Sequence, residues 1–75
     1  RHGQVDRATA NYREALQANP ETVRPAIELG ALLERHGDRA GAAAALQIAL
    51  DRGGPAALAE RIQALRAAKP EAERP

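Results

Sequence analysis

Residues 26–50 read AIELGALLERHGDRAGAAAALQIAL, and this stretch decides the expected fold. Its apolar residues recur at helical spacing on both sides of the pair Gly37-Asp38. Glycine commonly supplies the left-handed residue that follows a helix, and aspartate commonly caps the start of the next one. The stretch therefore predicts two helices joined by a tight turn, with the second helix beginning near Arg39.

Small and large apolar residues are interleaved along both predicted helices. The positions are Ala26, Leu29, Gly30, Leu33, Ala42, Leu46, Ala49 and Leu50. Glycine and alanine let two helix backbones approach closely, while leucine fills the space between them. This order of side-chain sizes therefore suits closely packed pairs of helices.

The sequence also repeats itself at a fixed offset. Arg-His-Gly at residues 1–3 recurs at residues 35–37, and we call the shift from Arg1 to Arg35 the repeat offset. At the same offset, identical residues recur in the second copy for Ala8, Ala10, Ala15 and Leu16. Tyr12 falls on Leu46, so both copies carry a large apolar residue there. We therefore expect Leu46 to be a central core residue.

These features resemble the tetratricopeptide repeat (TPR), a helix–turn–helix unit with a period of about 34 residues. The resemblance rests on the repeat offset, which equals that period, on Leu29-Gly30, on the Gly37-Asp38 turn and on Asn19-Pro20 at the close of the first copy. It covers about residues 1–54. The Sel1-like repeat shares several of these positions, but its typical glycine-rich insertions do not occur, so it ranks second.

The chain also departs from the family pattern. Ala26 and Leu33 stand where the family frequently has aromatic residues, and Gly54 replaces the closing proline. Because the family pattern is degenerate, we interpret these departures as tolerated variation. The resemblance implies an all-α chain of antiparallel helix–turn–helix repeats, a TPR-like α-solenoid.

The implied organisation has four parts. Residues 1–20 hold the second helix of a truncated unit, and residues 21–54 form a complete unit. Residues 55–69 form a C-terminal capping helix with a polar outer face, which a solenoid needs at its end. Residues 70–75 read as a disordered tail.

Turn and cap residues predict where each helix begins and ends. Residues 1–3 are a turn by the resemblance, and the first helix covers about residues 5–18. Thr22 is the expected cap of a helix that runs to about His36, with Pro25 in its first turn. The remaining helices cover about residues 39–52 and 56–68. In the last one, an apolar stripe is formed by Leu58, Ile62 and Leu65.

Composition favours helices and argues against several classes of function. The chain has 19 Ala and 8 Leu but one aromatic residue, Tyr12, and Val and Ile together number five. A net charge of +1, without a run of one sign, argues against a nucleic-acid partner. There is no cysteine, and the longest apolar run, residues 42–46, is far too short to span a membrane.

Candidate catalytic groups are sparse. His2 and His36 are the only candidates for a general base or a metal ligand, and no carboxylate cluster accompanies either. We interpret both as exposed residues near helix ends. No serine is present, and the glycines at Gly53-Gly54 lack the strand that precedes a phosphate-binding loop. The sequence therefore predicts a protein that is not an enzyme and that binds no cofactor or metal.

The resemblance implies a binding surface on the first helix of the complete unit. In the family these helices line a concave groove, and its positions fall on Arg24, Ile27, Ala31, Glu34 and Arg35. Some members use Lys and Asn at two of these positions to clamp carboxylates, and this chain has Ile27 and Ala31 there. The expected groove is therefore of mixed apolar and charged character and suits an extended or helical peptide. Arg24 and Glu28 lie one turn apart and are expected to pair.

The first helix presents a second candidate surface. In a complete unit it would pack partly on a preceding helix, and the chain lacks that helix. Its apolar face would then be partly uncovered and would favour self-association between copies of the chain. The residues of this face are Val5, Ala8, Tyr12 and Leu16.

The sequence thus favours a scaffold that binds a protein or peptide partner, without nucleic acid and without membrane insertion. Two alternatives stay open. One is a TPR appendage of a larger enzyme whose catalytic domain lies upstream, and the other is a structural spacer that only connects other repeats. The high content of Ala and Arg is typical of a GC-rich bacterial genome.

Overall fold

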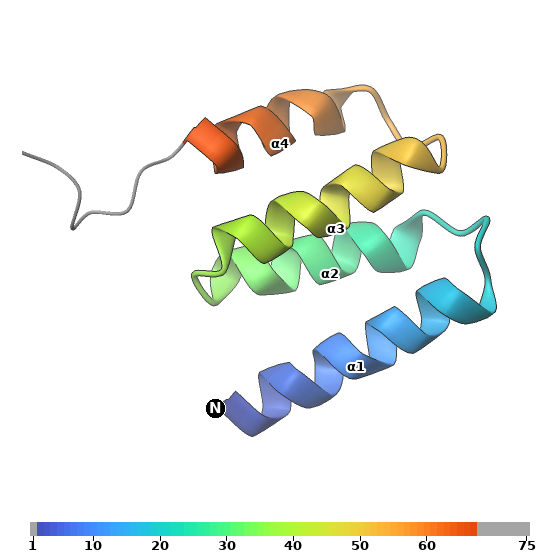
Figure 1. Cartoon of the computed structure of the whole chain (residues 1–75), viewed down its shortest axis with the longest axis vertical. Helices are drawn as coiled ribbons and strands as arrows, with labels where there is room; N and C mark the ends of the chain where they lie inside the picture. The colour runs from blue at the N-terminus through green and yellow to red at the C-terminus, as the bar shows by residue number, and fades with distance from the viewer. Residues whose placement is uncertain (1, 68–75) are drawn as a thin grey trace, which may run out of the picture.

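Four α-helices run through residues 2–67, the part of the chain that the computed structural model describes (Figure 1). They are α1 (His2–Ala18), α2 (Arg24–Arg35), α3 (Arg39–Asp51) and α4 (Ala57–Ala67). No strand occurs within residues 2–67, so the prediction of an all-α chain is confirmed. The predicted tail, residues 70–75, lies outside the described residues.

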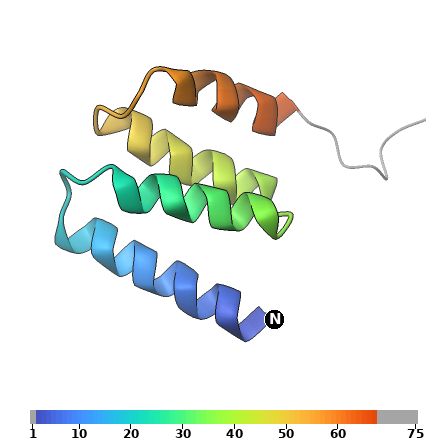
Figure 2. The same cartoon turned by 180° about the vertical axis from the view of Figure 1, so that it is seen from behind.

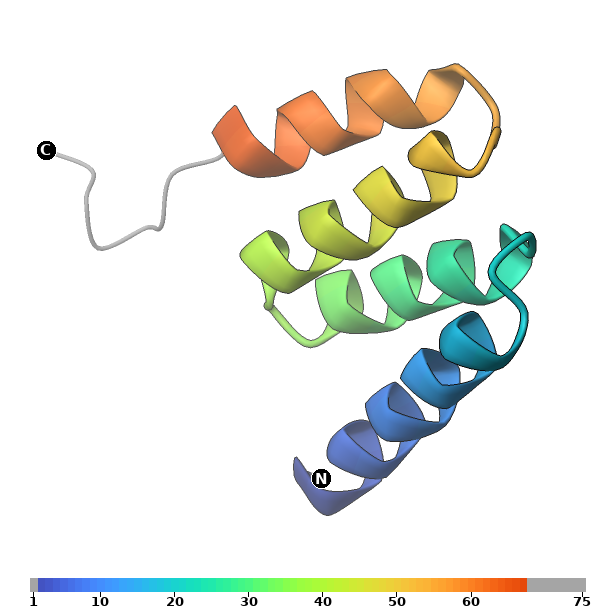
Figure 3. The same ribbon diagram turned by 45° about the vertical axis from the view of Figure 1, so that its right-hand side comes forward.

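Each helix packs against the helices next to it in sequence, and successive helices run antiparallel (Figures 1 and 2). α2 and α3 lie in the middle, with α1 and α4 at the two edges (Figure 3). The connections, residues 19–23, 36–38 and 52–56, are short, which makes neighbouring helices antiparallel. Among the described helices α1 packs on α2 alone, and it diverges from α2 toward its own N-terminus (Figure 1).

The apolar core is centred on α2 and α3. Its buried members are Leu16, Ala26, Leu29, Leu33, Ala42, Ala43, Ala45, Leu46, Ala49, Ile62 and Leu65. Leu46 is 5% exposed, so the prediction that it is a central core residue is confirmed. The stripe predicted for α4 is also confirmed, since Ile62 and Leu65 are buried and Leu58 packs against them from the edge.

Gly30 sets the close approach of α2 and α3. A Cβ atom at Gly30 would lie 2.7 Å from Cδ2 of Leu46 and 3.4 Å from the carbonyl oxygen of Ala42. The first distance is too short for an additional carbon, so the Leu46 side chain would have to shift, while the second is only tight. The Leu29-Gly30 pair of the sequence pattern thus has a direct packing reason.

α2 and α3 end in the same way. Gly37 and Gly53 follow these helices with φ angles of 84° and 95°, in the left-handed region that favours glycine. In both turns the glycine N–H donates to the carbonyl three residues earlier, and the next N–H donates to the carbonyl five residues earlier. This is the hydrogen-bond pattern of a Schellman motif, which satisfies carbonyls that the helix end leaves open.

Asp38 begins α3 as predicted. Its Oδ1 atom accepts a hydrogen bond of 2.8 Å from the N–H of Gly41. The expected pair between Arg24 and Glu28 is also present, with 3.5 Å between the Arg24 Nε and the Glu28 Oε2 atoms.

The predicted turn at residues 1–3 is wrong for His2 and Gly3, because α1 already begins at His2. The sequence explains the difference. At the repeat offset, Gln4 stands where Asp38 caps α3. Glutamine is a good helix former and a poor cap, so nothing in these residues starts a new helix at Val5.

Thr22 does not cap α2, so this prediction is also wrong. Its hydroxyl donates to the carbonyl oxygen of Asn19 at 2.8 Å, and Val23 takes the capping position without a side-chain hydrogen bond. Pro25 lies in the first turn of α2 as expected. There its missing N–H leaves no hydrogen bond unmade, so α2 can begin without a polar cap.

Arg52 ties the end of α3 to the connection between α1 and α2. Its Nη2 atom donates to the carbonyl of Leu16 at 3.1 Å, and its Nη1 atom donates to the carbonyl of Thr22 at 3.1 Å. A longer contact of 3.4 Å reaches the carbonyl of Asn19. These bonds join segments that lie far apart in sequence and satisfy carbonyls at the end of α1.

Candidate functional site

A hollow of about 280 Å³ opens between α2 and α4. Its lining consists of Ile27, Ala31 and Glu34 from α2, Leu46 from α3, and Ala57, Leu58 and Arg61 from α4. The two charged residues are a glutamate and an arginine, and the others are apolar. The hollow therefore offers an apolar surface with a charge-balanced rim.

Three of the five residues predicted for the groove lie together in this hollow. Ile27, Ala31 and Glu34 follow one another at helical spacing and share one stripe of α2. Arg24 is highly exposed and pairs with Glu28, while Arg35 is exposed at the end of α2, and neither lines the hollow. The chain thus places the apolar centre of the predicted groove in the hollow and leaves its two arginines outside.

An ion pair joins the two walls of the hollow. The Nη2 atom of Arg61 on α4 donates to the Oε1 atom of Glu34 on α2. Both side chains remain in contact with solvent, so such a pair contributes only about 0–1 kcal/mol to the free energy of folding. The pair therefore connects α2 and α4 across the rim but adds little to the stability of the fold.

The residues that α4 contributes were not predicted as part of the groove. A signal for two of them was present, because the repeat offset carries Arg24 onto Leu58 and Ile27 onto Arg61. α4 lacks a Leu-Gly pair like that of α2, so the sequence pattern does not predict that α4 shares the groove. Leu46 is the remaining addition, since a buried core residue also forms the floor of the hollow.

The face predicted for self-association is only partly free. Leu16 is 5% exposed and belongs to the chain's own core. Val5, Ala8 and Tyr12 are half-buried, and Tyr12 packs against the core. Leu16 is therefore not part of a surface that a second copy could contact. Self-association through the other three residues stays a prediction.

The described residues contain no cluster of three His, Cys, Asp or Glu side chains that could hold a metal ion. His36 is exposed in the turn after α2, and His2 lies within α1, so the two do not occupy equivalent turns. Of the helices within residues 2–67, none is both long and apolar enough to cross a membrane.

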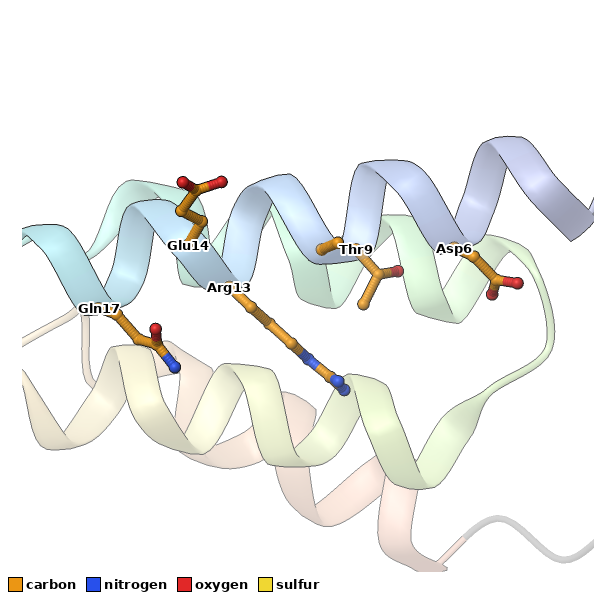
Figure 4. Close-up of a pocket in the computed structure, with 6 residues that line it drawn as sticks. Asp6, Thr9, Arg13, Glu14 and Gln17 are labelled. Atoms are coloured by element: carbon orange, nitrogen blue, oxygen red, sulfur yellow. The ribbon is translucent and has the colours of Figure 1, made fainter.

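The outer face of α1 carries a second, more open hollow (Figure 4). Its lining comes from α1 alone and is mostly polar, with Asp6, Thr9, Ala10, Arg13, Glu14 and Gln17. Figure 4 shows Arg13 extending from α1 toward α3, while Glu14 points to the other side of the helix. Because one helix alone lines it, this face is a weaker candidate for binding than the hollow between α2 and α4, to which three helices contribute.

No family model, curated protein or solved structure matches the chain.

Proposed function

We propose that the chain is a TPR-like interaction module that binds a peptide segment of a partner protein in the hollow between α2 and α4. The observation that carries the proposal is the hollow itself. It brings Ile27, Ala31 and Leu58 from two helices around an apolar floor at Leu46. Concave apolar surfaces with a few polar groups at the rim are the usual form of a binding site.

The spacing of the helices supports a repeated unit. α1 ends at Ala18 and α3 at Asp51, whereas α2 begins at Arg24 and α4 at Ala57. The two helix ends are therefore as far apart in sequence as the two helix starts. This distance is within one residue of the repeat offset, and helix boundaries are defined no better than that. The first helices of two successive units would then form the two walls of the hollow.

α4 has the character of a terminal cap. The face of α2 that packs on α3 carries Ala26, Leu29, Gly30 and Leu33, all buried. The residues of α4 at the same offset are Glu60, Gln63, Ala64 and Ala67, all exposed. This face has a glutamate and a glutamine and no large apolar side chain, so it suits contact with solvent, as terminal units of repeat proteins require.

The lining defines the kind of segment that the hollow suits. Its charged residues already neutralise each other in the Glu34–Arg61 pair, so a strongly charged partner gains little there. An apolar side chain of a helical or extended peptide fits the aliphatic lining. Ile27 and Ala31 carry no positive charge, so the proposal includes no clamp for carboxylates and gives the chain no catalytic role.

The test fills the hollow without disturbing the core. Peptides are first selected from a random library against the wild-type chain, and their affinity is then measured for Ala31→Gln. Ala31 is exposed and glutamine is a good helix former, so the variant should fold normally while its side chain occupies the hollow. The matched control is Ala44→Gln, at an exposed alanine of α3 outside the hollow.

The proposal expects the selected peptides to bind Ala31→Gln at least about tenfold more weakly and Ala44→Gln unchanged, since tenfold corresponds to about 1.4 kcal/mol. Equal affinities of both variants for the peptides would place the binding site elsewhere and would refute the proposal.

A further inference from the structure

A different hollow, of about 260 Å³, lies on the side of the molecule where α1 faces α3. We call it the α1–α3 cup, and its lining is Arg13, Leu16, Gln17, Ile48 and Arg52. It shares no residue with the hollow between α2 and α4. A binding event there can therefore be distinguished from binding at the site proposed above.

The cup has an aliphatic part that is open to solvent. Ile48 is 38% exposed, which is more than any other large apolar side chain of residues 3–67. Leu16 lies beside it in the lining and is buried. An aliphatic side chain of a partner would cover this surface, and the removal of apolar area from water would stabilise the complex.

Both charged residues of the cup are arginines, and no acidic side chain lines it. Arg13 forms no hydrogen bond or ion pair with any part of the chain that the structure describes. Figure 4 shows it extending over the gap toward α3, with the carboxylate of Glu14 on the other side of α1. Arg13 also lines a neighbouring hollow together with Asp6 and Asp38 but pairs with neither carboxylate, so its guanidinium is available for a partner's carboxylate.

Arg52 adds a second positive charge. Its hydrogen bonds go to the carbonyls of Leu16, Asn19 and Thr22, which hold the guanidinium in place. These acceptors are neutral groups, so the positive charge of Arg52 is not cancelled by an ion pair. The cup therefore combines one fixed and one movable guanidinium with an aliphatic surface.

We propose that the α1–α3 cup binds an acidic segment of a partner protein, in which the carboxylate of a glutamate or aspartate side chain follows an aliphatic side chain. The carboxylate pairs with Arg13 in the field of Arg52, and the aliphatic side chain lies on Ile48. Guanidinium groups match carboxylates in geometry and form charge-assisted hydrogen bonds with them. The positive charge of the lining thus favours a partner segment of negative charge.

The experiment titrates the ¹⁵N-labelled chain with three synthetic probes and follows the amide resonances by NMR. The first probe is acetyl-Ala-Leu-Glu-Leu-Ala-amide, and the second has glutamine in place of glutamate. The third is acetyl-Ala-Leu with a free C-terminal carboxylate. The third probe separates a side-chain carboxylate from a chain terminus, which carries the same chemistry.

The proposal expects the glutamate probe to shift the amides of Arg13, Gln17 and Ile48 and to bind more tightly than the glutamine probe. Arg13→Gln should weaken binding of the glutamate probe by about 5- to 10-fold, and added salt should weaken it in the wild type. Arg66→Gln is the matched control, because Arg66 is an exposed arginine of α4 outside the cup. Circular dichroism of both variants should match the wild type, because both side chains are exposed.

Several results would overturn the proposal. They are equal binding of the glutamate and glutamine probes, shifts confined to another face, no shift with any probe at millimolar concentration, and binding of the free carboxylate probe alone. Loss of affinity in Arg66→Gln equal to that in Arg13→Gln would also overturn it, because the effect would then come from net charge.

Discussion

α1 and α3 stand at equivalent places of the sequence repeat, yet the chain covers them to different extents. α3 packs against α2 and α4, whereas α1 packs against α2 alone among the described helices. Leu46 is 5% exposed, while Tyr12 at the matching position is half-buried. The burial of a helix in this chain thus depends on the number of its neighbours as well as on its own apolar pattern.

The largest expected effect comes from the better covered helix. Leu46→Ala should lower the free energy of unfolding by about 2–5 kcal/mol, because it opens a cavity in the core and removes the contact with Gly30. Urea denaturation followed by circular dichroism measures the loss. A loss below about 1 kcal/mol is typical of an exposed site and would contradict the position of Leu46 between α2 and α4.

Tyr12→Ala should cost less than Leu46→Ala, although tyrosine is the larger side chain. Tyr12 is only half-buried at the edge of the core, so we expect a loss of about 1–2 kcal/mol. The same urea titration checks the order of the two variants. If Tyr12→Ala lowered the free energy of unfolding more than Leu46→Ala, α1 would be covered more fully than the structure shows.

The turn between α2 and α3 could be predicted from the sequence, because Gly37 and Asp38 each have a strong local preference for their position. The start of α1 could not be predicted, since the repeat suggested a turn at residues 1–3, but Gln4 stands after it in place of a capping aspartate. The cap of α2 could not be predicted either, because the Thr22 hydroxyl donates to the carbonyl of Asn19 instead. In the candidate site, the α2 residues followed from the repeat, but the wall from α4 did not. The residues of α4 carry too little of the repeat pattern.

Arg52 shows another limit of sequence reasoning. It reaches backbone carbonyls of the connection between α1 and α2, and every residue type supplies such carbonyls. No pattern of side chains marks its partners. The role of Arg52 therefore became visible only when the helices were placed in space.

Arg52→Gln tests how far that side chain supports α1. Losing these hydrogen bonds should cost about 1–2 kcal/mol and should loosen the C-terminal turn of α1 before the rest of the chain. Thermal denaturation gives the size of the effect. Arg35→Gln is the control, since Arg35 is exposed at the end of α2 and is not among the residues that line the hollow between α2 and α4. Equal losses in both variants would show that Arg52 acts through charge alone.

Substitutions at two glycines within helices should have small effects of opposite sign. Gly3→Ala should stabilise the chain by up to about 1 kcal/mol, because a Cβ atom there meets nothing within 4 Å and alanine favours a helix. Gly30→Ala gains the same preference but must displace Leu46, so a net loss of about 1–2 kcal/mol is expected. Stabilisation by both substitutions would contradict the close contact of α2 and α3.

Native-state hydrogen exchange of the ¹⁵N-labelled chain tests the difference between α1 and α3 most directly. Amides in helices that are packed on two sides exchange only through larger openings than amides in a helix packed on one side. The account predicts the slowest exchange in α2 and α3, around Gly30 and Leu46, and faster exchange throughout α1. Protection in α1 equal to that in α3 would contradict it.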